Sequence, residues 1–149
     1  MIAKSDVKIA VCLTALWCFS PSQAMAQPKL EDLADAPVLF LETARKFRQW
    51  DEPAEPAKLF GSVYFVGTKG LGSFLITGSE GHILIYTGMP GSGPMIEASI
   101  RKLGFKPEDV KIILTGHAHI DHVGGHAHLQ KVSGAKIAMM REEQALFES

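Results

Sequence analysis

Residues 110–125 read VKIILTGHAHIDHVGG, and this stretch decides how the rest of the chain is interpreted. It begins with a short apolar run, residues 110–114, that predicts a strand buried on both faces. Ligand sites in open α/β sheets lie at the carboxyl ends of the strands. Directly after the run, four side chains that can bind a metal ion fall within six positions: His117, His119, Asp121 and His122. The stretch therefore predicts a metal site at the end of a buried strand.

The spacing of these four residues suggests two neighbouring metal positions. In an extended segment, residues two apart project to the same side, so His117 and His119 can meet one cation. Asp121 and His122 lie at the predicted turn into the next helix and can face a second position nearby. Imidazole and carboxylate donors together suit a borderline divalent ion such as zinc. The alternative is a solvated, histidine-rich loop without a metal.

Small residues and two further histidines accompany the candidate ligands. Gly116, Gly124 and Gly125 allow the backbone to approach closely, and a Gly-Gly pair near a helix start indicates a packing requirement. We expect His126 and His128 to be exposed or to support the ligands from behind, since metal-binding imidazoles need partners that orient them.

The rest of the sequence predicts an α/β fold, with helices covering a mixed sheet. A helix is expected at residues 38–50. Strands are expected at 59–66, 71–77 and 82–87, where they form an antiparallel meander. A helix then opens near Pro94 and stops at Gly104. Strands at 110–114 and 135–139 alternate with helices after it, which predicts parallel pairing.

The first 26 residues predict an export signal. Lys4 and Lys8 precede an apolar run at residues 9–19, and Ala24-Met25-Ala26 is a small-x-small cleavage pattern. Because a membrane-spanning helix needs about 20 apolar residues, this run is too short to serve as one. We expect cleavage after Ala26 and a periplasmic or secreted protein. An uncleaved anchor is the alternative.

Composition limits the remaining classes of function. The chain has 149 residues, 46% of them hydrophobic and 21% charged, so it is globular and at most one domain. A net charge of −1 creates no field for nucleic acid or an anionic membrane, so neither is expected as a partner. Both cysteines, Cys12 and Cys18, lie in the leader, which leaves the mature chain without a thiolate ligand or a disulfide.

The pattern His-x-His-x-Asp-His followed by Gly-Gly, directly after a buried strand, resembles the metallo-β-lactamase superfamily. Four further segments are similar to subclass B3 of that superfamily: WDEPAEP at 50–56, VYFVGT at 63–68, GHILI at 81–85 and TGMP at 87–90. His122 fits this subclass, because the other subclasses usually have arginine there and use a cysteine ligand.

The resemblance implies a fold, a site and an activity. The fold would be the N-terminal half of the αββα sandwich, with a signal peptide at 1–26, an N-terminal extension at 27–57 and an incomplete domain at 58–149. His117 and His119 would hold one zinc ion, and Asp121 and His122 a second, so that a full-length chain carries two. Asp121 would also be catalytic, because it orients the zinc-bound hydroxide that opens the β-lactam ring. The substrate would be a small molecule and the full-length protein a monomer.

Two departures from the family qualify this expectation. Tyr86 stands where the superfamily commonly has an aspartate that supports the metal loop; it either weakens metal binding or is an ordinary strand residue. Family members also continue beyond the equivalent of residue 149 and supply a further histidine to each zinc. We therefore expect the chain as given to be an inactive fragment that binds zinc weakly.

Two other functions stay open. The same loop occurs in superfamily hydrolases of other substrates, namely glyoxalase-II-like thioesterases and lactonases. A non-catalytic, truncated domain that binds only a metal ion or a partner is the third possibility.

Overall fold

The computed structural model describes residues 36–148 of the chain, with their side chains from residue 38 onward. The predicted signal peptide and the first part of the predicted extension lie outside the described residues. Among the described residues, no helix is long and apolar enough to cross a membrane.

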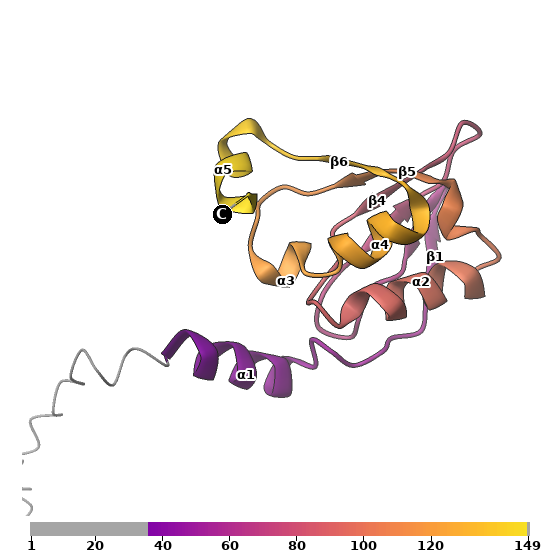
Figure 1. The fold of residues 1–149 in the computed structure, drawn as a ribbon. Coiled ribbons are helices and arrows are strands. Elements are labelled where there is room, and N and C mark those ends of the chain that lie inside the picture. The colour runs from indigo at the N-terminus through magenta and orange to yellow at the C-terminus, as the bar shows by residue number, and fades with distance from the viewer. Residues whose placement is uncertain (1–35, 149) are drawn as a thin grey trace, which may run out of the picture. The chain divides into compact units, whose positions relative to one another are not determined.

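Helices and strands follow one another in the order expected for an α/β chain (Figure 1). The strands are β1 (Ala57–Phe60), β2 (Val63–Phe65), β3 (Phe74–Ile76), β4 (His82–Ile85), β5 (Val110–Leu114) and β6 (Lys136–Ala138). The α-helices are α1 (Ala36–Arg48), α2 (Ser92–Lys102), α3 (Ile120–Val123), α4 (His126–Ser133) and α5 (Gln144–Phe147). Two short 3₁₀ turns, η2 (Pro107–Asp109) and η3 (Arg141–Glu143), precede β5 and α5.

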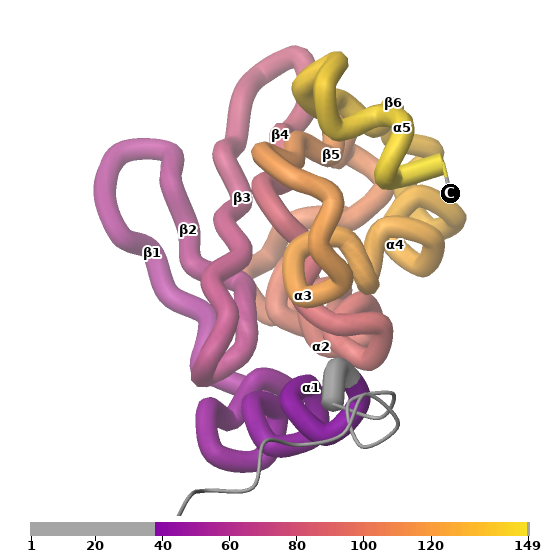
Figure 2. Tube along the Cα trace, turned by 90° about the vertical axis from the view of Figure 1, so that its left-hand side faces the viewer, coloured from indigo at the N-terminus to yellow at the C-terminus, as the bar shows by residue number. Residues whose placement is uncertain are grey.

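The six strands form one mixed sheet in the order β1-β2-β3-β4-β5-β6. The first three pairings are antiparallel, whereas β4–β5 and β5–β6 are parallel. Figure 2 shows the neighbouring strands in this order along the sheet. The predicted meander followed by a parallel portion is confirmed.

One predicted strand is wrong in detail. The stretch 59–66 is not a single strand but the end of β1, a turn and β2, paired as an antiparallel hairpin. The turn falls at Gly61, whose φ of +50° is a left-handed conformation that glycine adopts without steric cost. Strand propensity alone does not predict this turn, because β-branched and aromatic residues lie on both sides of the single glycine.

The core lies between one face of the sheet and helices α2 and α4. Leu75, Leu84 and Ile113 are fully buried, and they lie side by side on adjacent strands. The helices cover this row with Ile96 and Ile100 from α2 and Leu129 from α4, which belong to the same buried cluster. Burying an aliphatic side chain contributes roughly 1.5–3 kcal/mol. This row therefore anchors the two helices that flank the candidate metal loop.

The opposite face of β5 is open, which corrects the prediction that this strand is buried on both faces. Ile112 and Leu114 retain 37% and 40% of their surface. They pair in register with Ile83 and Ile85 of β4, which are only partly buried. The apolar run at residues 110–114 therefore forms a strand with one face packed under the helices and a second face that is apolar but exposed.

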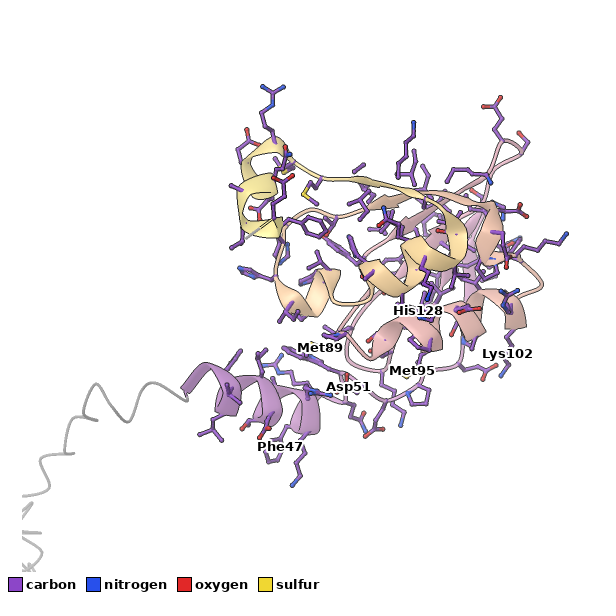
Figure 3. The ribbon with its side chains drawn as sticks, in the orientation of Figure 1. Phe47, Asp51, Met89, Met95, Lys102 and His128 are labelled. Atoms are coloured by element: carbon purple, nitrogen blue, oxygen red, sulfur yellow. The ribbon has the colours of Figure 1, made fainter. Side chains whose placement is uncertain are left out.

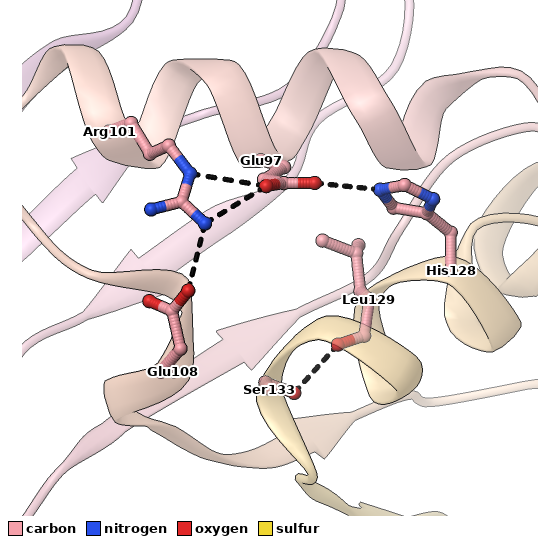
Figure 4. Close-up of polar contacts among 6 residues, drawn as sticks. All are labelled: Glu97, Arg101, Glu108, His128, Leu129 and Ser133. Carbon is pink, nitrogen blue, oxygen red and sulfur yellow. Dashed lines mark hydrogen bonds and ion pairs between the residues drawn. The ribbon is translucent and has the colours of Figure 1, made fainter.

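A polar network joins α2 to α4 (Figure 4). Glu97 accepts hydrogen bonds from Arg101 at 3.0 Å and 3.1 Å, and its other carboxylate oxygen lies 2.8 Å from Nε2 of His128. Figure 3 shows His128 on α4 directed toward α2. Hydrogen bonding by His128, followed by that of Arg101, lowers the pKa of Glu97. His128 therefore links helices on the surface rather than approaching the predicted ligands.

Candidate metal centre

The structure brings the four predicted ligands together after β5. The ring centroids of His117 and His119 are 4.8 Å apart, and those of His117 and His122 are 4.2 Å apart. Asp121 Oδ2 lies 3.3 Å from His122 Nε2. The first turn of α3 sets this arrangement, because the amides of His122 and Val123 both donate to the His119 carbonyl. Asp121 and His122 therefore lie within α3, whereas the sequence predicts that they lie at the turn before the helix.

The cluster is open to solvent. His119 is exposed, and His117, Asp121 and His122 are half-buried. Partial burial lowers the pKa of His122, the nearby Asp121 carboxylate opposes this shift, and the neighbouring imidazoles add to it. The neutral imidazole is the form that binds a metal ion.

The donor set suits a divalent ion, but no three ligands converge on one position. Within residues 36–148, no group of three or more His, Cys, Asp or Glu side chains is arranged to hold one metal ion. The contacts instead join the ligands in pairs. By residue type and proximity the cluster fits zinc, with further donors needed to complete each coordination sphere.

The flanking glycines are required by close backbone packing, as predicted. A Cβ atom on Gly124 would lie 2.4 Å from the backbone nitrogen of Pro90, and one on Gly125 would lie 2.4 Å from the carbonyl oxygen of Thr87. The segment after β4 therefore packs backbone to backbone against the junction between α3 and α4. This packing fixes the helix that carries Asp121 and His122.

Tyr86 lies at the base of the candidate ligands. Its ring centroid is 4.7 Å from that of His122 and 6.2 Å from that of His117. A Cβ atom on Gly116 would fall 2.7 Å from the Tyr86 hydroxyl oxygen. The φ of Tyr86 is +58°, a left-handed conformation that is strained for an aromatic residue. Tyr86 is therefore part of the site and not an ordinary strand residue.

His126 does not match the prediction of an exposed side chain. It is 3% exposed, and its Nδ1 lies 2.6 Å from Oγ1 of Thr87. Burial lowers its pKa to about 4, so the ring is neutral at physiological pH. Its partner Thr87 donates in turn to the His122 carbonyl, so His126 is joined to the ligand loop through Thr87.

Two residues near the loop were given no role by sequence reasoning. The amide of Ala118, between His117 and His119, donates to the Glu143 carboxylate at 3.0 Å. Thr87 bonds to the carbonyl of His122. No local signal marks Glu143, which is 25 residues away in sequence. Thr87 could have been suspected from the small-residue segment TGMP that follows β4.

Comparison with known proteins places this site in a family. Residues 72–148 match the family model of the metallo-beta-lactamase superfamily, and the chain belongs to that superfamily. The six-stranded sheet and its helices match the N-terminal half of the superfamily fold, as predicted. Proteins of this family are metal-dependent hydrolases.

Solved structures of subclass B3 enzymes are similar to the chain, which confirms the subclass resemblance. The metallo-β-lactamase MIM-1 from Novosphingobium pentaromativorans is 50% identical with a TM-score of 0.58, over 59% of this chain and 32% of that one. The subclass B3 enzyme BJP-1 of Bradyrhizobium japonicum is 43% identical with a TM-score of 0.64, over 67% and 38%. An N-acyl homoserine lactonase from Bacillus cereus is 33% identical over 36% of this chain and 30% of its own length. The chain thus spans about a third of each relative.

Proposed function

We propose that this chain carries the zinc-binding loop of an exported hydrolase that opens β-lactam rings. The observation that supports this most is that three imidazoles and one carboxylate lie in contacting pairs after β5, in a fold similar to subclass B3 enzymes. Two zinc ions are proposed for the protein. His117 and His119 would hold one, and Asp121 with His122 would hold the other.

The residues of the loop would divide the chemistry between them. When bound, zinc supplies a water of lowered pKa and an electrophile for the carbonyl oxygen. Asp121, which is half-buried, would accept a hydrogen bond from the attacking water and orient it. A small-molecule substrate would reach the site from the side of His119, which is exposed.

Export and domain organisation belong to the same proposal. Residues 1–26 would direct the protein to the periplasm or beyond, residues 27–57 would form an extension, and residues 58–149 would belong to the metallo-β-lactamase domain. The proposed partner is a small-molecule substrate. We propose a monomer that binds neither nucleic acid nor, after cleavage of the leader, a membrane.

A lactone is the second candidate substrate. The similarity to an N-acyl homoserine lactonase favours this ring over a thioester. The higher identity to β-lactamase structures favours the lactam. A domain that binds metal without catalysis is also consistent with the paired rather than triple arrangement of ligands.

The test is zinc content and hydrolysis, measured on protein expressed from its complete natural reading frame. We expect zinc by elemental analysis and turnover of a carbapenem, with an acyl homoserine lactone and a thioester assayed beside it. His119→Asn and Asp121→Asn should lower zinc content. His82→Asn and Asp109→Asn, matched changes outside the cluster, should leave the zinc content unchanged.

Unchanged zinc content in the His119→Asn and Asp121→Asn variants contradicts the ligand assignment. Zinc binding with turnover of the lactone alone would favour the second substrate, and zinc binding without turnover the non-catalytic domain.

A further inference from the structure

The backbone carbonyl of His122 accepts two hydrogen bonds from one residue, Thr87. The Thr87 amide nitrogen lies 2.9 Å from this oxygen, and the Thr87 hydroxyl oxygen lies 3.2 Å from it. Thr87 is fully buried, and it follows β4, whereas His122 belongs to α3. Two donors on one carbonyl fix both the position and the direction of that peptide group. The peptide adjoins the Cα atom from which the His122 side chain extends.

The hydroxyl of Thr87 has a second partner, which determines where the protons lie. Nδ1 of His126 is 2.6 Å from Thr87 Oγ1. A hydroxyl has one proton and the carbonyl of His122 can only accept, so Thr87 donates to His122. Nδ1 of His126 then carries the proton that it donates to Thr87 Oγ1. Because burial keeps the ring neutral at physiological pH, the lone pair of His126 then lies on Nε2.

That lone pair has no protein partner, although it is buried. Among the described residues, Nε2 of His126 has no hydrogen-bond partner, and the ring lies against Phe147 at a centroid distance of 5.7 Å. An unsatisfied buried polar atom costs stability, and an apolar side chain of similar size would avoid that cost. We attribute the presence of a histidine at position 126 to its other ring nitrogen, Nδ1, which orients the hydroxyl of Thr87.

We propose that Thr87, oriented by His126, is a positioning residue that sets the direction in which His122 presents its imidazole to a divalent cation. The inference rests on the proposed zinc site. It assigns no contact with substrate to Thr87 or His126. It also gives a physical reason for Gly125, because a side chain there would displace the Thr87 carbonyl.

The experiment compares variants that keep or remove each hydrogen-bonding group, in protein from the complete reading frame. Thr87→Ser keeps the hydroxyl and Thr87→Val removes it at nearly constant volume. His126→Asn keeps a donor near the position of Nδ1, and His126→Leu removes it. Zinc affinity is measured by competition with a chelating dye, and ligand geometry by the visible absorption of the cobalt(II) form. Thermal unfolding of the metal-free protein checks the fold.

We expect Thr87→Val and His126→Leu to lose about 10–100-fold in zinc affinity, the range seen when groups behind metal ligands are removed. Thr87→Ser and His126→Asn should stay close to wild type in affinity and in the cobalt spectrum. His126→Leu should leave the metal-free protein at least as stable, so its loss of affinity cannot be attributed to unfolding. Wild-type affinity in Thr87→Val, or equal losses in the serine and valine variants, would overturn the proposal.

The two proposals fail in different ways. A wild-type protein that binds no zinc refutes the proposed function. Positioning is then judged in the metal-free protein from the carbonyl carbon chemical shift of His122. An upfield shift in Thr87→Val and none in Thr87→Ser supports the hydroxyl bond to this carbonyl. An identical shift in both variants overturns it.

Discussion

Tyr86 shows how one residue can alter a site whose ligands are all present. Its ring contacts His122 and its hydroxyl occupies the space that a side chain at Gly116 would need. An aromatic ring packs against imidazoles but gives them no strong acceptor. A carboxylate at the same position would accept from the ring N–H groups and hold them in place. The family resemblance singled out position 86 from the sequence, whereas the left-handed backbone conformation of Tyr86 is visible only in the structure.

This difference leads to a prediction for Tyr86. We expect Tyr86→Asp to raise zinc affinity by about tenfold or more, because a carboxylate orients ligand imidazoles. Tyr86→Phe is the matched control and should change affinity little, since it keeps the ring packing. Dye competition at constant ionic strength measures both. Equal affinities in all three proteins would mean that the loop needs no support from this position.

His126 makes stability depend on pH. Its pKa is about 4 in the folded protein because of burial, against about 6.5 when the chain is unfolded. Between these values the unfolded state binds more protons, so stability falls as pH falls and levels off below pH 4. From pH 7.5 to 5 the loss assigned to this residue is about 2 kcal/mol. Urea unfolding at both pH values measures it.

The control for this pH effect is His126→Leu, which removes the titrating group and keeps the site apolar. We expect a clearly smaller loss of stability in this variant over the same pH range. His122, whose pKa is also lowered, contributes in the same direction in both proteins and does not affect the comparison. An identical pH dependence with and without His126 would contradict the assignment.

At the scale of elements, the junction between α3 and α4 depends on glycine for a steric reason. A Cβ atom on Gly125 would overlap the carbonyl of Thr87 at 2.4 Å, and backbone cannot move aside as a flexible side chain can. We predict that Gly125→Ala destabilises the protein by about 1–3 kcal/mol, the usual range for overpacking. Gly91→Ala is the control, because nothing lies within 4 Å of its Cβ position. Chemical denaturation measures both variants, and equal stability would show that the junction is loosely packed.

The elements also show what could be read from sequence. Helix α2 and the antiparallel meander followed from periodicity and turn residues, because both depend on neighbours close in sequence. The parallel pairing followed from the alternation of strands and helices after them. The hairpin of β1 and β2 was missed, since a single left-handed glycine does not interrupt a propensity pattern. The four candidate ligands could be named from their spacing, but their support from Thr87, Glu143 and His126 depends on contacts 25 or more residues apart.

For the whole described molecule, the sheet has one packed face and one apolar, uncovered face. Leu84 and Ile113 are fully buried under the helices, while Ile112 and Leu114 on the other side of β5 are more than a third exposed. Alternation along one strand therefore separates two different environments. The same apolar run in a sequence fits a strand that is buried on both faces and a strand that is buried on one face only.

This asymmetry predicts how a protein of residues 27–149 behaves in solution. Contiguous apolar surface on a sheet promotes self-association. We therefore expect the average molar mass of this protein, measured by sedimentation, to rise with protein concentration. Ile112→Lys with Leu114→Lys should suppress that rise, because each lysine places a charge on the open face. Leu39→Lys with Phe47→Lys is the control: it changes two exposed apolar residues of α1 and adds the same charge. Suppression by both pairs alike would assign the effect to net charge. Suppression by the β5 pair alone would assign the association to the sheet face that carries Ile112 and Leu114.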